Sequence, residues 1–186
     1  MFPYLDPTIV LLIPAVLFSL WAQFKVKGAF SRYSEVRASS GVTADQVSRE
    51  LLDRFGLGNV RVERIQGHLT DHYDPRSKVL RLSDAVAGNS SIAAIGVAAH
   101  EVGHAIQDKE GYAFLRFRNS IVPAVNIGST MSMPLFFIGL IMGSAPLLNI
   151  GILLFCVVLV FHLVTLPVEF DASARALKLL SETGLL

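Results

Sequence analysis

The chain has 186 residues, a formal net charge of +1 at neutral pH, and only 17% charged residues against 52% hydrophobic ones. This length suits about one domain. The apolar composition excludes a disordered chain, and the near-zero net charge argues against a nucleic-acid-binding protein. The single cysteine, Cys156, excludes an intramolecular disulfide and a zinc site made of four cysteines. The composition leaves an unusually apolar globular protein or a membrane protein.

The first apolar segment lies at residues 7–24, in the position of a signal peptide. A signal peptide has basic residues before its apolar region and small residues at a cleavage site. Here the only charged residue before the segment is Asp6, and the segment ends in Trp21-Ala22-Gln23-Phe24. We therefore interpret residues 1–24 as a retained transmembrane anchor. We expect residues 24–36 to form an amphipathic stretch that runs along or out of the membrane surface.

Residues 25–118 have the pattern of a small α+β domain. A capping box at residues 43–46 predicts the start of a helix, and Gly56 predicts its end. The turn signal Asp74-Pro75-Arg76-Ser77 joins the last two of three strand-like runs. These runs are found at residues 60–65, 68–73 and 78–82. A second helix is expected at residues 92–107, with Asn89, Ser90 or Ser91 as its cap.

This second helix carries an HExxH motif, His100-Glu101-Val102-Gly103-His104. Residues four apart lie on one face of a helix, so both imidazoles can bind one ion. Glu101 is placed to take a proton from a metal-bound water. Two imidazoles with an open position suit Zn²⁺, and we expect one ion per chain. The alternative interpretation is a solvated helix face without a metal.

A second apolar region, residues 119–168, contains no Asp, Glu, Lys or Arg over 50 residues. A bilayer core needs about 20 helical residues, so this region is long enough for two spans. Gly143-Ser144-Ala145-Pro146 interrupts it and predicts a transmembrane hairpin, with spans near residues 121–143 and 147–166. A hairpin returns the chain to the side it left. Arg118 and Glu169 are therefore expected in the same compartment.

The basic residues predict the orientation of the chain. Residues 25–118 hold 14 of the 16 Lys and Arg residues, and residues 169–186 hold the other 2. The positive-inside rule places both segments in the cytoplasm. With the anchor, this predicts about three transmembrane helices, a cytoplasmic metallopeptidase domain at residues 25–118 and a cytoplasmic helix at residues 169–186.

The third zinc ligand must come from outside the motif, since a catalytic zinc usually has three protein ligands and a water. Glu169 is the first charged residue after the uncharged region, and it emerges on the same side as the HExxH helix. Asp171 is the nearest rival, although on a helix it would point about 200° away from Glu169. His162 is a second rival and lies about two turns deeper in the span.

Several segments together resemble a known family. They are Ala98-Ala99-His100-Glu101-Val102-Gly103-His104-Ala105-Ile106-Gln107, Asp71-His72-Tyr73-Asp74-Pro75, Val79-Leu80-Arg81-Leu82-Ser83, and Leu166-Pro167-Val168-Glu169-Phe170-Asp171-Ala172-Ser173. Over essentially the whole chain the sequence is similar to the YugP-like membrane zinc metallopeptidases. The resemblance implies a gluzincin-type site like that of the HtpX-type membrane proteases. The ligands would be His100, His104 and Glu169, and the base would be Glu101.

This chain departs from those families in two ways. The HtpX-type pattern has an aspartate about one turn after its ligand glutamate, where this chain has Ser173, so the roles of residues behind the ligands do not transfer. Members of the YugP-like family usually extend beyond this C-terminus with another apolar segment. The resemblance therefore leads us to expect a further span beyond Leu186.

Three other residues are candidates for oxyanion or substrate contacts. His72 and Tyr73 alternate with other polar residues along a strand-like run, and Arg175 lies six residues after Glu169. The simpler interpretation is an exposed edge strand for the first two and a juxtamembrane charge for the third. An edge strand at residues 68–73 would also hold an extended peptide substrate by strand addition.

These observations predict a membrane-embedded zinc endopeptidase of the bacterial plasma membrane, with its catalytic domain facing the cytoplasm. Its substrates would be membrane or membrane-proximal proteins, and Glu101 would act as general base. Two alternatives are a site-2-type intramembrane protease and a non-catalytic scaffold that keeps zinc for structure. Charged residues on both sides of the motif helix, Asp84 and Lys109, argue against the first. Glu101 argues against the second, because a structural zinc site needs no base.

Overall fold

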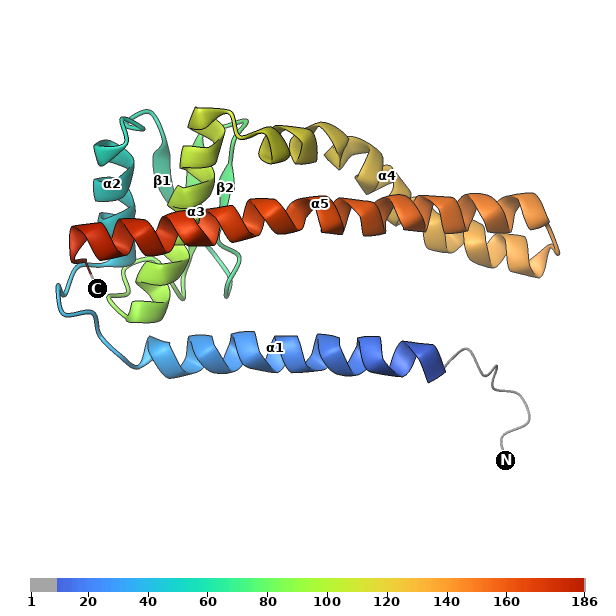
Figure 1. Ribbon diagram of the computed structural model, residues 1–186, viewed down its shortest axis with the longest axis horizontal. Helices are drawn as coiled ribbons and strands as arrows, with labels where there is room; N and C mark the ends of the chain where they lie inside the picture. The colour runs from blue at the N-terminus through green and yellow to red at the C-terminus, as the bar shows by residue number, and fades with distance from the viewer. Residues whose placement is uncertain (1–9, 186) are drawn as a thin grey trace.

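The α+β class is confirmed by the computed structural model, which describes residues 10–185 (Figure 1). Within that range it has five α-helices and one three-stranded sheet. The elements in chain order are α1 (Leu12–Ser34), α2 (Ala44–Arg54), β1 (Arg61–Ile65), β2 (His72–Asp74), β3 (Val79–Ser83), α3 (Ile92–Glu110), α4 (Ala113–Ile141) and α5 (Ala145–Thr183). The first residues of the predicted N-terminal anchor, 1–9, lie outside the described residues.

A small domain forms one end of the molecule, and α1, α4 and α5 extend from it toward the other end (Figure 1). The N-terminal end of α1 and the turn between α4 and α5 lie at that same far end. α1 continues as one helix to Ser34, so the stretch expected separately at residues 24–36 is mostly an extension of the predicted anchor. Within the described residues, the three segments that run between the two ends are all helices, the kind of structure that can pass through a bilayer.

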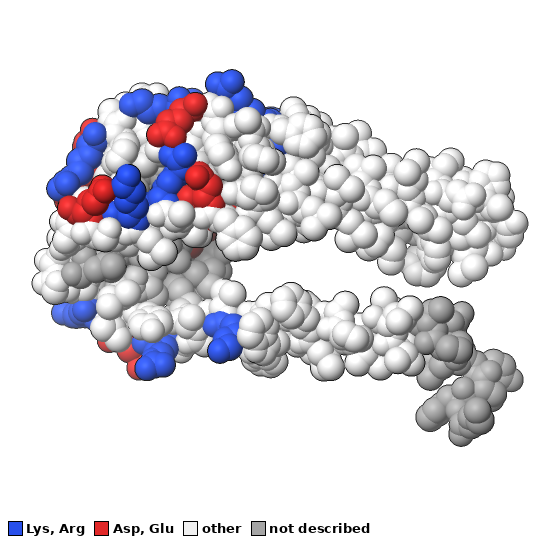
Figure 2. Space-filling view, viewed as in Figure 1, with Lys and Arg blue, Asp and Glu red and all other residues white. Residues whose placement is uncertain are grey.

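Two helices of the described chain, α4 and α5, are long and apolar enough to cross a membrane. The turn between them, at residues 142–144, lies where the sequence predicts the hairpin to reverse. Charged side chains gather over the domain, and the visible face of the hairpin has none (Figure 2). A Cβ atom on Gly151 would lie 2.9 Å from the Ser132 carbonyl oxygen, so glycine allows the two helices to pack closely.

The sheet has the strand order β1-β3-β2, so β2 is an edge strand. β1 pairs with β3 in parallel, and β2 pairs with β3 antiparallel, with Tyr73 opposite Leu80. The strand predicted over residues 68–73 is wrong at its N-terminal end, because β2 begins only at His72. Gly67 and Leu69 have φ angles of +129° and +55°, which an extended strand does not accommodate.

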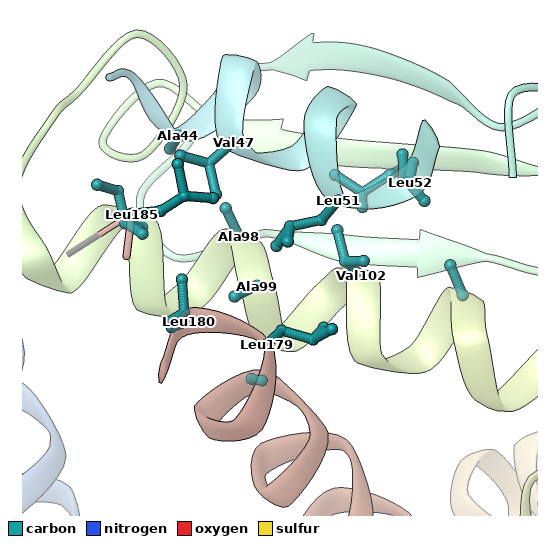
Figure 3. Close-up of a cluster of buried hydrophobic side chains, with 14 of the residues drawn as sticks. Ala44, Val47, Leu51, Leu52, Ala98, Ala99, Val102, Leu179, Leu180 and Leu185 are labelled. Atoms are coloured by element: carbon teal, nitrogen blue, oxygen red, sulfur yellow. The ribbon is translucent and has the colours of Figure 1, made fainter. Parts of the chain in front are cut away.

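The hydrophobic core of the domain joins α2, α3, β3 and the C-terminal part of α5 (Figure 3). No break separates the second hairpin span from the segment predicted as a separate helix at residues 169–186, because α5 runs unbroken to Thr183. Its last turns are therefore anchored in the domain core. The labelled core residues are Ala44, Val47, Leu51, Leu52, Ala98, Ala99, Val102, Leu179, Leu180 and Leu185.

Candidate metal centre

The HExxH motif lies in the middle of α3, and both ends of this helix are capped. Ser91, one of three predicted caps, accepts a hydrogen bond from the Ala94 N–H at 3.3 Å. Gly111 ends the helix in the left-handed conformation, with φ at +67°. The side chain of His100 is 25% exposed and that of His104 is 10% exposed. The motif therefore lies on a helix with both ends capped, and His100 is the more exposed of its two histidines.

Glu169 of α5 meets both histidines of α3. Its Oε2 lies 3.2 Å from His100 Nε2 and 3.5 Å from His104 Nε2. One ligand atom from each of these three residues lies within 4.8 Å of the others. Two imidazole nitrogens and one carboxylate oxygen are the donor set of many catalytic zinc sites. The donor set of the cluster therefore fits Zn²⁺, and its three members are the residues that the sequence predicts as ligands.

The two alternative candidates for the third ligand, Asp171 and His162, lie outside the cluster. Asp171 Oδ2 accepts hydrogen bonds from Gln107 Nε2 at 2.8 Å and from Arg175 Nε at 2.6 Å. His162 Nδ1 lies 2.7 Å from the carbonyl oxygen of Val158, one turn earlier in α5. Neither residue is a member of the His100–His104–Glu169 cluster. Asp171 instead supports this cluster from behind through Gln107.

Gly103, inside the motif, lies at a close approach of α3 and α5. A Cβ atom at this position would lie 2.7 Å from the Ala172 carbonyl oxygen, a distance that side chains do not tolerate. Ala172 lies three residues after Glu169 on α5. The missing side chain therefore lets α5 come near enough for Glu169 to reach both histidines.

Gln107, one turn after His104, orients the buried histidine. Its side-chain N–H groups donate to the Val168 carbonyl at 2.9 Å and to Asp171. Its Oε1 is therefore the acceptor that faces His104 Nδ1 at 3.0 Å. A proton on Nδ1 leaves the lone pair of Nε2 directed at the cluster, the form that binds a metal. Sequence reasoning missed this role, although the i,i+3 spacing on α3 signals the contact.

Ser173 supports the other histidine. Its Oγ lies 3.2 Å from His100 Nδ1, and Nε2 of the same ring faces Glu169. The serine therefore contacts His100 from behind, at the sequence position where the HtpX-type pattern has an aspartate. A hydroxyl oxygen in this place can accept a hydrogen bond from Nδ1–H, and unlike an aspartate it adds no charge.

Glu101 is 8% exposed and is held by the edge strand. Its Oε2 accepts a hydrogen bond from the Tyr73 backbone N–H at 2.9 Å. Burial raises the pKa of Glu101, against the opposing effect of the two neighbouring histidines and the Tyr73 N–H. For His104, burial acts to lower the pKa, but the contacts with Glu169 and Glu101 outweigh it and raise that pKa. A carboxylate with a raised pKa is suited to accept and return a proton near neutral pH.

The three residues expected at the oxyanion already have partners. The Tyr73 hydroxyl donates to Asp108 Oδ2 at 2.7 Å, and burial together with Asp108 raises the pKa of Tyr73 far above its usual value. The His72 ring lies between the Thr70 carbonyl oxygen, 2.9 Å from Nδ1, and the Arg81 guanidinium, 3.3 Å from Nε2. Arg175 binds Asp171 and Glu110 and lines a different cavity. His72 and Tyr73 line the site, and Arg175 does not.

A cavity of about 240 Å³ opens over the cluster. Its walls include His100, Glu101, His104 and Glu169, together with Arg118 and Asn119 from the second turn of α4. The sequence does not predict Arg118 or Asn119 as site residues, because α4 lies beside the motif only in the folded chain. A second cavity, of about 470 Å³, is also lined by His100; its walls are mostly apolar and come mainly from α1 and α3.

The chain matches a protein family described as "putative neutral zinc metallopeptidase" over residues 8–186. This protein belongs to that family. It is 49% identical over 176 residues to a Bacillus subtilis (strain 168) protein named "Putative membrane protease YugP". The match covers 95% of this chain and 78% of that relative. No solved structure matches the chain.

Replacement of Gly103 by alanine tests the close helix contact. In an ordinary helix interior, Gly→Ala stabilises by about 0.5–1 kcal/mol. Here the methyl group meets the Ala172 carbonyl, so we expect Gly103→Ala to lower the free energy of unfolding by about 1–3 kcal/mol and to weaken zinc binding. Thermal unfolding in detergent and metal analysis measure the two effects.

Gly96, two turns earlier on α3, provides the matched control. A Cβ atom there meets no atom within 4 Å, so Gly96→Ala should leave stability unchanged or raise it. Equal stability and equal zinc content in the two variants would contradict the role assigned to Gly103.

Proposed function

We propose that this zinc metallopeptidase is a membrane-embedded endopeptidase with Glu101 as its general base. The observation that carries the proposal is the convergence of His100, His104 and Glu169 in one cavity whose wall also includes Glu101. One Zn²⁺ per chain would be held by His100 Nε2, His104 Nε2 and a Glu169 oxygen. When bound, Zn²⁺ supplies Lewis acidity to a water and to the peptide carbonyl.

Glu101 would carry the proton through the reaction. Within residues 10–185, its carboxylate has one hydrogen-bond donor, the Tyr73 N–H at Oε2, so Oε1 is free to take a proton. In the forward reaction, Glu101 accepts a proton from the attacking water. It then returns this proton to the leaving nitrogen as the peptide C–N bond breaks. The fixed N–H at Oε2 orients the carboxylate for both transfers.

The surroundings of the site support membrane or membrane-proximal protein substrates. The cavity is bounded by the first turns of α4 and by Glu169 of α5, the two helices apolar enough to span a bilayer. α3 is not one of these helices, and it packs within the charged domain, which favours this function over a site-2-type intramembrane site. By the positive-inside rule, the domain would face the cytoplasm, at a bacterial plasma membrane.

The edge strand restricts how a substrate would bind. The free edge of β2 faces α3, since the Tyr73 N–H points at Glu101 and away from β3. The Tyr73 N–H already donates to Glu101, and Pro75 has no backbone N–H. Substrate pairing by strand addition would therefore use the backbone carbonyl groups of β2 more than its N–H groups.

Glu101→Gln separates the base from the ligands. The amide cannot accept a proton, so we expect kcat for peptide hydrolysis to fall by about 10²–10⁴-fold while the zinc content stays that of the wild type. The assay uses the full chain in detergent, fluorescently labelled casein and metal analysis. Glu50→Gln, an exposed carboxylate on α2, is the control and should hydrolyse casein at the wild-type rate. Wild-type rates in Glu101→Gln would show that Glu101 is not the base.

Glu169→Ala tests the third ligand. Removal of one of three protein ligands leaves an incomplete set, so zinc should be lost at chelator concentrations that the wild type withstands. Glu182→Ala, on the exposed surface of the same helix, should bind zinc as the wild type does. Competition with a chromogenic chelator gives both affinities, and equal values would exclude Glu169 as a ligand.

A further inference from the structure

Among the described residues, Arg118 is the one Lys or Arg that lines the site cavity, and its side chain has no hydrogen bond or ion pair with any of them. It lies in the second turn of α4 and lines the cavity with His100, Glu101 and Glu169. Its Nε atom is buried, and no hydrogen bond reaches it from any residue between 10 and 185. Native proteins leave few buried donors unsatisfied, so an arginine that lines a cavity and has an unsatisfied Nε is a candidate to bind a group there.

The acidic residues of the same cavity are already engaged. Both oxygens of Asp71 accept hydrogen bonds from Ser83, at 2.7 and 2.9 Å. Glu101 is held by the Tyr73 N–H, and Glu169 faces the two histidines. No ion pair of Arg118 is found among the described residues, although Arg175 nearby has two carboxylate partners. The guanidinium is therefore available to a ligand of the cavity.

A hydrogen-bond donor to the carbonyl oxygen would assist peptide hydrolysis at this site, in addition to the Lewis acidity that Zn²⁺ supplies. When water attacks the carbonyl carbon, the electron pair of the C=O bond moves to oxygen, and a donor placed there lowers the barrier. The donors expected from sequence are committed elsewhere: the Tyr73 hydroxyl to Asp108, and the Arg175 guanidinium to Asp171 and Glu110. A guanidinium stays protonated throughout, so it stabilises the charge without taking part in the proton transfers.

We propose that Arg118 is a catalytic residue that donates to the carbonyl oxygen of the scissile peptide bond. This assignment rests on the proposed endopeptidase function. The new C–O bond forms as Glu101 takes the proton of the attacking water. The electron pair then returns from the carbonyl oxygen, the C–N bond breaks, and Glu101 protonates the leaving amine. Arg118 binds the oxygen most strongly while it carries the negative charge, so its contribution is to kcat.

Arg116 provides a matched comparison two residues earlier. Both arginines lie in the first turns of α4, near the predicted membrane boundary, and removal of either one changes the net charge equally. Arg116 is exposed and does not line the cavity, whereas Arg118 is half-buried and does. A role in the reaction therefore predicts a large difference between the two variants. If both arginines act only as positive charges near the membrane, the two variants should have the same kcat.

The test uses the zinc-loaded full chain in nanodiscs, with labelled casein as substrate. We expect Arg118→Ala to lower kcat by about 10²–10³-fold, with KM changed by less than about threefold and the zinc content unchanged. Added methylguanidinium should restore part of this loss, which a merely structural role would not allow. Arg118→Lys should lie between the wild type and Arg118→Ala, because a single ammonium lacks the planar fork of the guanidinium. Arg116→Ala should keep the wild-type kcat.

Three results would overturn the proposal. The first is a kcat for Arg118→Ala equal to that of Arg116→Ala. The second is a loss of kcat that follows a loss of zinc and that methylguanidinium does not restore. The third is an equal change in both variants that appears in nanodiscs with anionic lipid and disappears in zwitterionic phosphatidylcholine nanodiscs, which would assign Arg118 to binding of anionic lipid headgroups. Failure of the endopeptidase function itself is distinguishable, because nanodiscs with the wild type would then hydrolyse casein no faster than empty nanodiscs.

Discussion

The contact of α3 with α5 at Gly103 is the constraint on which the candidate site depends. The two histidines come from one short motif, but Glu169 lies more than sixty residues later, beyond the whole hairpin. A Cβ atom at Gly103 would lie 2.7 Å from the Ala172 carbonyl oxygen of α5. Gln107 binds the same stretch of α5 through a hydrogen bond to the Val168 carbonyl. One glycine and one buried amide therefore set the distance between the imidazoles and the carboxylate.

The domain core fixes the other end of the same helix. Leu179 and Leu180 pack with α2 and α3, so α5 is held on both sides of Glu169. Gln107 contacts Nδ1 of His104, and Ser173 contacts Nδ1 of His100. The Nε2 atom of each ring therefore faces the Glu169 carboxylate. The histidines and Glu169 are therefore brought into position by packing, and their hydrogen bonds refine the orientation.

The sequence predicts those parts of the site that depend on spacing along the chain. HExxH places two histidines on one helix face, and the uncharged length of residues 119–168 indicates that Glu169 returns to the side of the motif. It does not predict contacts that arise only when distant segments meet. Arg118 looks like an ordinary juxtamembrane charge until α4 is placed beside α3, and Ser173 looks unremarkable until it faces His100. Likewise, the residues before His72 look like strand until the left-handed backbone at Leu69 is seen.

The unbroken course of α5 links the candidate centre to the thickness of the bilayer. The 24 residues from Ala145 to Val168 would measure about 36 Å as a helix, against a hydrocarbon layer of about 30 Å. Where α5 crosses a membrane, this excess is taken up by tilt. Pro167, inside the helix and two residues before Glu169, removes a backbone hydrogen bond at the end of the span. In a bilayer, acyl chain length would therefore act on the same helix that carries the Glu169 carboxylate.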